Sequence, residues 1–146
     1  MSEIKYYYNL DRFTEMQQYY YKVAYNELSN GQKRTHWMWY IFPQIDGLGH
    51  SETAKKYAIK TAEEAKAYLH DPLLGKNIRE ISALLLNDNI SSDVSKVFGY
   101  PDDLKLCSSM TLFLEVSGEE TFKKVLDKFF DGKEDERTIK LLKGKK

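Results

Sequence analysis

The stretch Pro101-Asp-Asp-Leu-Lys-Leu-Cys-Ser-Ser-Met-Thr-Leu-Phe-Leu114 predicts a long helix in the middle of the molecule. Proline suits the first position of a helix, and Asp102 and Asp103 lie favourably against the positive end of the helix dipole. Apolar residues recur at steps of three and four, and two more widen the stripe: Leu104, Cys107, Met110 and Leu114, with Leu106 and Phe113. A helix that is apolar over most of its circumference belongs inside a domain.

Helical patterns continue on both sides of this stretch. Apolar residues at helical spacing, with capping residues before several of them, predict helices at about 11–28, 51–59, 62–69, 72–86, 93–98, 119–130 and 135–142. Thr61 and Glu64 form a capping box, in which the hydroxyl accepts a hydrogen bond from the amide of Glu64 and the carboxylate reaches back.

No segment alternates apolar and polar residues with a period of two, so nothing indicates a sheet. The sequence therefore predicts an all-α fold, a single compact multihelical domain of about seven helices. We expect this domain to span residues 10–142, with an N-terminal tail or lead-in at 1–9 and a basic tail at 143–146.

An aromatic segment, Lys33-Arg-Thr-His-Trp-Met-Trp-Tyr-Ile-Phe-Pro-Gln44, holds both tryptophans of the chain. Thr35 could cap a short helix that Pro43 ends, while a buried strand is the alternative for so short an apolar run. Because the segment is too apolar to be exposed, the polar groups of Arg34, His36 and Gln44 must find partners or line a cavity.

Composition limits the possible functions. The chain has 146 residues, 22 basic and 22 acidic side chains and a net charge of zero, so no strong field attracts nucleic acid or an anionic membrane. A single cysteine, Cys107, excludes an intrachain disulfide and fits a reducing compartment. The N-terminus lacks the pattern of a signal peptide, and no apolar run is long enough for a membrane helix. We expect a cytoplasmic protein that binds neither nucleic acid nor membrane.

The front of the aromatic segment is the first candidate site. Arg34 could hold a phosphate or carboxylate with two hydrogen bonds, and His36 could act as an acid or base near neutral pH. Trp37 and Trp39 could stack on a flat ring, and Gln44 could bind its polar edge. The alternative is a core helix in which Arg34 reaches the surface and His36 binds a backbone carbonyl.

Two further segments are candidates. Gly47-Leu-Gly-His-Ser51 opens a predicted helix, where free amides attract anions. The segment lacks the remainder of a dinucleotide or P-loop motif, and an ordinary capped loop is the alternative. On the helix after Pro101, Lys105 lies over Ser108 and Ser109, and a lysine can activate a serine. The alternative is that these hydroxyls bond back to the helix backbone.

Metal and cofactor sites are not expected. The acidic loop around Asp131 and Gly132 lacks the spacing of a calcium loop, and His36, His50 and His70 show no metal-binding spacing.

These motifs resemble the family called domain of unknown function 1810, some of whose members are labelled calpastatin. The resemblance covers about residues 10–142 and includes K-R-T-H-W-M-W-Y-I-F-P-Q, G-L-G-H-S, F-G-Y-P-D-D-L-K-L-C-S-S-M-T-L-F and F-F-D-G-K-E-D-E-R-T. It implies a compact, mostly helical, monomeric domain and carries no established activity. A calpastatin-like inhibitor is expected to be largely disordered, whereas this composition is that of a packed core.

The resemblance also implies where a site would lie, because many of its motif positions are polar: Arg34, His36, Trp37, Trp39, Gln44, Gly49, Ser51, Asp102, Asp103, Lys105, Ser108, Ser109, Asp131, Gly132 and Thr138. We therefore predict a pocket for a small polar ligand that carries a phosphate or nucleotide. Its expected catalytic candidates are His36, Asp103 and Lys105, and its expected binding residues are Arg34, Trp37, Trp39, Gln44, Gly49, Ser51, Tyr57 and Ser109. In this hypothesis Arg34, His36 and Gln44 face Asp103 and Lys105.

Two roles of such a pocket are compatible with the sequence: binding of the ligand alone, or binding followed by catalysis. The alternative function is a non-enzymatic protein-interaction module with a patch of exposed tyrosines, namely Tyr6, Tyr7, Tyr8 and Tyr21, because tyrosine is favoured at interface hot spots.

Overall fold

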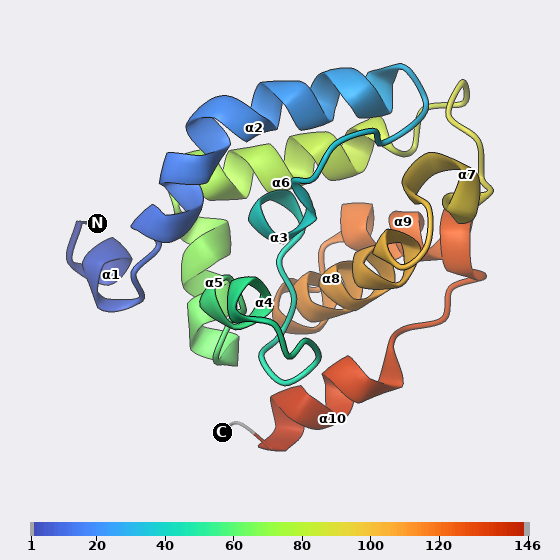
Figure 1. Cartoon of the computed structure of the whole chain (residues 1–146). Coiled ribbons are helices and arrows are strands. Elements are labelled where there is room, and N and C mark those ends of the chain that lie inside the picture. Colours follow the sequence, from blue (N-terminus) through green and yellow to red (C-terminus); the bar gives the residue numbers. More distant parts are fainter. Residues whose placement is uncertain (1, 145–146) are drawn as a thin grey trace.

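The computed structural model describes residues 2–144, and helix α8 (Asp102–Ser117) lies at its centre (Figure 1). α8 packs against α5 (Ala62–His70), α7 (Val94–Phe98), α9 (Glu120–Phe130) and α10 (Glu136–Gly144). Its side chains are buried continuously from residue 108 to 113. The central position predicted from the apolar circumference of this helix is therefore confirmed.

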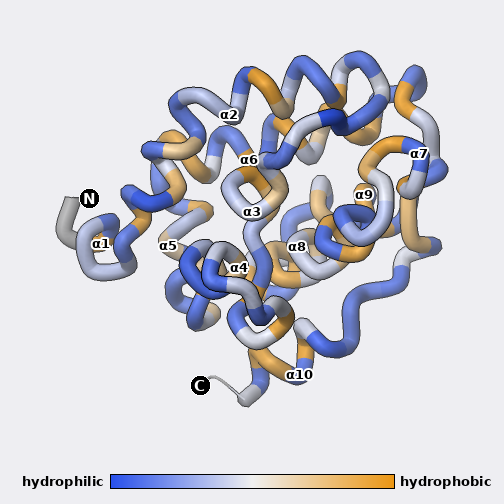
Figure 2. The backbone as a smooth tube through the Cα atoms, viewed as in Figure 1, coloured by the Kyte–Doolittle hydropathy of each residue, from blue (hydrophilic) through white to orange (hydrophobic). Residues whose placement is uncertain are grey.

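Helices α2 (Asp11–Ser29) and α6 (Pro72–Leu84) run side by side and cover one side of the domain (Figure 1). α6 also contacts α5 and α9, so it connects this layer to the central helix. Individual helices carry both hydrophobic and hydrophilic residues along their length, as Figure 2 shows, which is expected of helices that bury one face.

Residues 2–144 contain ten helices rather than the predicted seven or so. Helices α1 (Ser2–Tyr7), α3 (Met38–Ile41) and α4 (Glu52–Lys56), like α7, are only four to six residues long. Helices this short show little periodicity, and α1 was not predicted, whereas α4 and α7 lie within the predicted ranges 51–59 and 93–98. The all-α class and the single compact domain are confirmed.

No strand occurs within residues 2–144, where one isolated parallel bridge joins Ile45 and Ile59. The amide of Ile59 donates to the carbonyl of Gln44 at 2.8 Å, and the amide of Asp46 donates to the carbonyl of Ile59 at 2.8 Å. This bridge fixes the chain just after the aromatic segment.

The terminal segments are largely helical where they are described. α1 lies within the segment predicted as a tail or lead-in, and α10 runs to Gly144. Met1, Lys145 and Lys146, which belong to the two predicted tails, lie outside the described residues.

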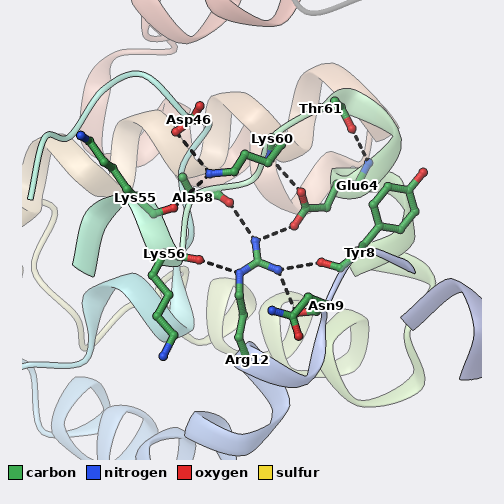
Figure 3. Close-up of polar contacts among 10 residues, drawn as sticks. All are labelled: Tyr8, Asn9, Arg12, Asp46, Lys55, Lys56, Ala58, Lys60, Thr61 and Glu64. Atoms are coloured by element: carbon green, nitrogen blue, oxygen red, sulfur yellow. Dashed lines mark hydrogen bonds and ion pairs between the residues drawn. The ribbon is translucent and has the colours of Figure 1, made fainter. Parts of the chain in front are cut away.

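A buried ion pair between Arg12 and Glu64 ties α2 to the first turn of α5 (Figure 3). Their side chains are 8% and 3% exposed, and the two charged atoms lie 2.7 Å apart. The Arg12 guanidinium also donates to four backbone carbonyls, those of Tyr8, Asn9, Lys56 and Ala58. A buried charge is tolerated only when it is paired and hydrogen-bonded in this way.

The predicted capping box at the start of α5 is formed in part. The Thr61 hydroxyl accepts a hydrogen bond from the amide of Glu64 at 3.1 Å, as predicted. The Glu64 carboxylate reaches back one residue further than expected, to the amide of Lys60 at 2.9 Å. Its other oxygen is held by Arg12, which explains the shifted partner.

Candidate functional site

Two neighbouring pockets lie where the aromatic segment meets the start of α8. The larger, which we call the Ser51 pocket, has a volume of about 580 Å³. Its polar lining comes from four parts of the chain: Gln44, His50, Ser51, Lys105, Ser108, Asp135 and Arg137. Its apolar lining includes Leu48, Ala54 and Leu104.

The second cavity, which we call the Arg34 pocket, has a volume of about 350 Å³. Its charged and polar lining consists of Lys33, Arg34, His36, Asp102 and Lys105. Its remaining lining is apolar or aromatic: Met38, Trp39, Phe98, Tyr100 and Pro101. Both volumes fall in the range of small-molecule sites.

Trp39, Pro101 and Lys105 line both pockets and so form their shared wall. The Lys105 ammonium lies 4.2 Å from the centroid of the Trp39 ring, a cation–π contact. Its Nζ also pairs with Asp102 at 3.2 Å. These two contacts hold the ammonium at the boundary between the pockets.

Asp102 is shared by two lysines. Its second oxygen lies 2.7 Å from Nζ of Lys33, whose side chain is only 6% exposed. Lys33 also donates to the carbonyl of Thr35 at 2.6 Å and lies over the Trp37 ring. Lys33 is therefore committed to the protein, whereas the Lys105 ammonium has three donors and one ion pair among the described residues.

Basic side chains outnumber acidic ones around the two pockets. The linings contain four basic side chains, those of Lys33, Arg34, Lys105 and Arg137, and two acidic ones, those of Asp102 and Asp135. Within residues 2–144, Arg34 and Arg137 enter none of the ion pairs, and both are exposed. A local excess of positive charge in a protein of zero net charge favours an anionic ligand.

Glu27, in the last turns of α2, fixes the front of the aromatic segment. Its carboxylate accepts hydrogen bonds from the amides of Arg34 and Thr35, from the Thr35 hydroxyl and from the indole nitrogen of Trp37, at 2.6–3.1 Å. Burial by itself raises the pKa of Glu27, but these hydrogen bonds outweigh it and lower the pKa to about 2.

The prediction that Thr35 caps a helix through the aromatic segment is wrong. α3 begins only at Met38, after Trp37, and no side chain caps it. The Thr35 hydroxyl is already used by Glu27, which holds residues 34–37 in a non-helical conformation.

The loop before α4 packs tightly enough to require glycine at position 49. A Cβ on Gly49 would lie 2.6 Å from the Cβ of Ala54, and both residues line the Ser51 pocket. The Ser51 hydroxyl caps α4 by accepting from the amide of Ala54 at 3.1 Å. Ser51 thus has the predicted capping role, and it also lines the pocket.

A hydrogen-bond network around Asp135 places Arg137 in the lining of the Ser51 pocket. The Asp135 carboxylate accepts hydrogen bonds from Ser108 at 2.8 Å and from Thr138 at 2.5 Å, and its amide donates to Thr111 at 2.8 Å. These bonds attach the start of α10 to α8 and so bring Arg137 to the pocket.

The structure brings together seven of the residues that the sequence singled out: Arg34, His36, Trp39, Gln44, Gly49, Ser51 and Lys105. Arg34 and His36 share the Arg34 pocket with Lys105, and Gln44 shares the Ser51 pocket with it.

Four other predicted site residues line neither pocket. Trp37, Tyr57 and Ser109 are buried in the core. Trp37 is held there by its bond to Glu27, and Tyr57 packs against the rings of Phe13 and Tyr40. The Asp103 carboxylate accepts from the amide of Leu104 at 2.8 Å and lies in the first turn of α8, where the helix dipole favours an acidic side chain.

The sequence interpretation missed several lining residues: Lys33, His50, Tyr100, Leu104, Arg137 and, as a partner of two lysines, Asp102. The spacing of Asp102 and Lys105, three residues apart on a helix, was a usable signal. No local pattern in the sequence indicates that Arg137 lines a pocket, because its position depends on how α10 packs against α8.

The described part of the chain contains no helix long and apolar enough to cross a membrane. Within the same residues, no group of three histidine, cysteine, aspartate or glutamate side chains is placed to hold a metal ion.

The fold and site define a class: a compact all-helical domain with a positively charged double pocket. The chain belongs to the family described as "Protein of unknown function (DUF1810)", whose model matches residues 7–142. Its structure is similar to the crystal structure of the conserved hypothetical protein Rv1873 from Mycobacterium tuberculosis, with a TM-score of 0.90 and 44% sequence identity. That similarity covers 93% of this chain and 97% of the other. No curated protein matches the chain.

Proposed function

We propose that the chain binds a small anionic metabolite that carries a flat ring, such as a nucleotide or another phosphate-bearing compound, in the double pocket. The observation that carries this proposal is the Lys105 ammonium, which lies on the Trp39 ring at the wall shared by both pockets. Two donors of Lys105 remain for a ligand, and a phosphate oxygen is a strong acceptor for them.

Each pocket combines charge with apolar surface, as a ring-bearing anion requires. In the Ser51 pocket, Leu48 and Leu104 accompany Arg137, and in the Arg34 pocket, Phe98 and Tyr100 accompany Arg34. Pockets of this composition orient a ligand with a few polar groups while apolar walls bury its ring.

Calorimetric titration with adenosine diphosphate and with sugar phosphates tests the proposal, with thermal shift as a second readout. We expect binding by the wild type and at least about tenfold weaker binding by Lys105→Gln, because the variant loses a charge-assisted hydrogen bond. The matched control is Lys123→Gln, since Lys123 also makes one helical ion pair, at 3.1 Å to Asp127. Absence of binding by every compound at millimolar concentration would overturn the proposal.

His36 distinguishes binding with turnover from binding alone. It lines the Arg34 pocket with Lys105, where it could act as an acid or base on a bound ligand. If the protein is an enzyme, His36→Asn should retain ligand affinity and lose product formation. Unchanged product formation in this variant would remove His36 from the catalytic candidates.

The alternative function is a protein-interaction module, and exposed tyrosines on α1 favour it. Tyr6 and Tyr7 are 86% and 79% exposed, whereas the Tyr21 hydroxyl is already bound to Glu80. Replacement of Tyr6 and Tyr7 by serine should abolish co-purification of a partner if this function holds. In that case Lys105→Gln should leave the partner bound.

We further propose that the protein acts as a cytoplasmic monomer; its single cysteine, which fits a reducing compartment, supports the cytoplasmic location. Size-exclusion chromatography with light scattering should return a mass near 17.1 kDa.

A further inference from the structure

We infer that the double pocket binds a ligand with two ring-bearing units joined by an anionic bridge, a dinucleotide-like compound, with one unit in each pocket and the bridge against Lys105. This inference rests on the proposed function and specifies its ligand class. The observation that supports it is that the site consists of two pockets, of about 580 and 350 Å³, which share one wall.

The charges are arranged for a ligand that spans the wall. Arg34 lines only one pocket and Arg137 only the other, while Lys105 lines both. A mononucleotide confined to one pocket leaves the guanidinium of the other pocket unused. A compound that crosses the wall places its bridge at Lys105 and reaches both outer cations.

Asp102 sets the charge at the bridge position without cancelling it. Its carboxylate is shared between Lys33 and Lys105, at 2.7 and 3.2 Å. Two ammonium groups against one carboxylate leave a net positive charge beside the wall. The bridge is therefore the part of the ligand that we expect to be anionic.

Exposed apolar side chains flank the wall on both sides. Tyr100, which is 82% exposed, lines only the Arg34 pocket, and Leu104, which is 54% exposed, lines only the Ser51 pocket. Pro101 stands between them in the sequence and lines both pockets. Large apolar groups on both sides of a cationic wall fit two rings, each with its own surface to cover.

The test compares adenosine diphosphate with diadenosine diphosphate, in which two adenosines share the same diphosphate bridge. We expect the dinucleotide to bind at least about tenfold more tightly, because the second unit binds at high effective concentration. The dinucleotide carries less negative charge than adenosine diphosphate, so charge alone would produce the opposite order.

Two variants locate the units. Tyr100→Ala and Leu104→Ala should both weaken dinucleotide binding, while adenosine diphosphate should respond to only one of them. Both side chains are exposed, so the fold should survive, and thermal unfolding checks this. Lys123→Gln is again the control.

The outcomes separate this inference from the proposed function. Equal affinity for the two compounds, or loss of dinucleotide binding in only one variant, would overturn the inference and leave the proposed function standing. Absence of binding by both compounds at millimolar concentration would overturn both.

Discussion

At the residue scale, single carboxylates of this chain are strongly influenced by their surroundings, in opposite directions. Glu27 is surrounded by four hydrogen-bond donors, and its pKa falls to about 2. Glu134 has a buried oxygen without a hydrogen-bond partner among the described residues. Burial first, and then the neighbouring Glu115 carboxyl, raise the pKa of Glu134 to about 7. The two groups therefore predict opposite dependences of stability on pH.

Glu27→Gln should destabilise the protein at neutral pH. The amide loses the charge that the four donors stabilise, and we expect a cost of about 1–2 kcal/mol after solvent screening. A carboxylate with a lowered folded pKa contributes stability above its unfolded pKa of 4.5, and this contribution is lost as the pH falls toward 2. Urea denaturation at several pH values should show the gap between variant and wild type closing below pH 4.5. A gap that is constant with pH would contradict the ionised hydrogen-bonded carboxylate.

Glu134→Gln should have the reverse profile. A carboxyl with a raised folded pKa contributes stability below its unfolded pKa of 4.5 and loses it as the pH rises through about 7. The variant cannot ionise, so its melting temperature should exceed that of the wild type at pH 8 and match it near pH 4.5. Thermal unfolding at both values measures this, and Glu136→Gln, an exposed neighbour, serves as the control. No gain at pH 8 would show that the pair is already relieved by solvent.

At the element scale, helices are joined by a few contacts that the sequence does not announce. α5 approaches α6 so closely that a Cβ on Gly75 would collide with the carbonyl oxygen of Leu69. α2 is joined to the first turn of α5 by Arg12 and Glu64, which are 52 positions apart in the sequence. The first contact involves a backbone carbonyl, and the second involves two charged side chains that are buried. Neither set of atoms can shift easily to accommodate a substitution.

Gly75→Ala should be destabilising although alanine is the better helix former. The collision involves backbone rather than a flexible side chain, so α5 and α6 must separate, at a cost of about 2–3 kcal/mol or more. Chemical denaturation measures the loss. Lys76→Ala, the next position of the same helix, changes propensity without a collision and should stay within about 0.5 kcal/mol of wild type. A Gly75→Ala variant as stable as this control would mean that the helices can adjust freely.

Arg12→Ala should cost about 3–5 kcal/mol, because it leaves the buried Glu64 carboxylate without its counter-charge. Four backbone carbonyls lose their donor in the same variant. Equilibrium unfolding in urea measures the change, and Lys123→Ala, which breaks an exposed ion pair, should cost less than about 1 kcal/mol. Similar costs for the two variants would show that the Arg12 cluster is not buried in solution.

Local signals identified the elements that extend over several turns, and failed where structure depends on distant partners. The apolar circumference of Pro101–Leu114 was sufficient to place α8 at the centre. Thr35, by contrast, has the side chain of a helix cap and is used instead by Glu27, eight residues earlier. The same limit applies to the site, because Trp39 and Lys105 were found through their motifs, while Arg137 reaches the pocket only through the docking of α10.

At the scale of the whole molecule, the net charge is zero but the charged side chains are unevenly distributed. Basic and acidic residues are equal in number, yet the linings of the two pockets contain four basic and two acidic side chains. Such an arrangement can attract an anion to one face without making the protein basic. It therefore predicts different salt dependences for ligand binding and for stability.

Affinity for adenosine diphosphate should fall several-fold between about 0.05 and 0.5 M sodium chloride, because salt screens exposed charges such as Arg34 and Arg137. The melting temperature of the free protein should change little over the same range, since its net charge is zero and the ion pair between Arg12 and Glu64 is buried. Calorimetric titration and thermal unfolding in the same buffers measure the two quantities. Either Arg34→Gln or Arg137→Gln, depending on the pocket that the mononucleotide occupies, should reduce the salt dependence of binding, whereas Lys123→Gln should not. Binding that is independent of salt would mean that apolar contacts, rather than the excess positive charge of the double pocket, select the ligand.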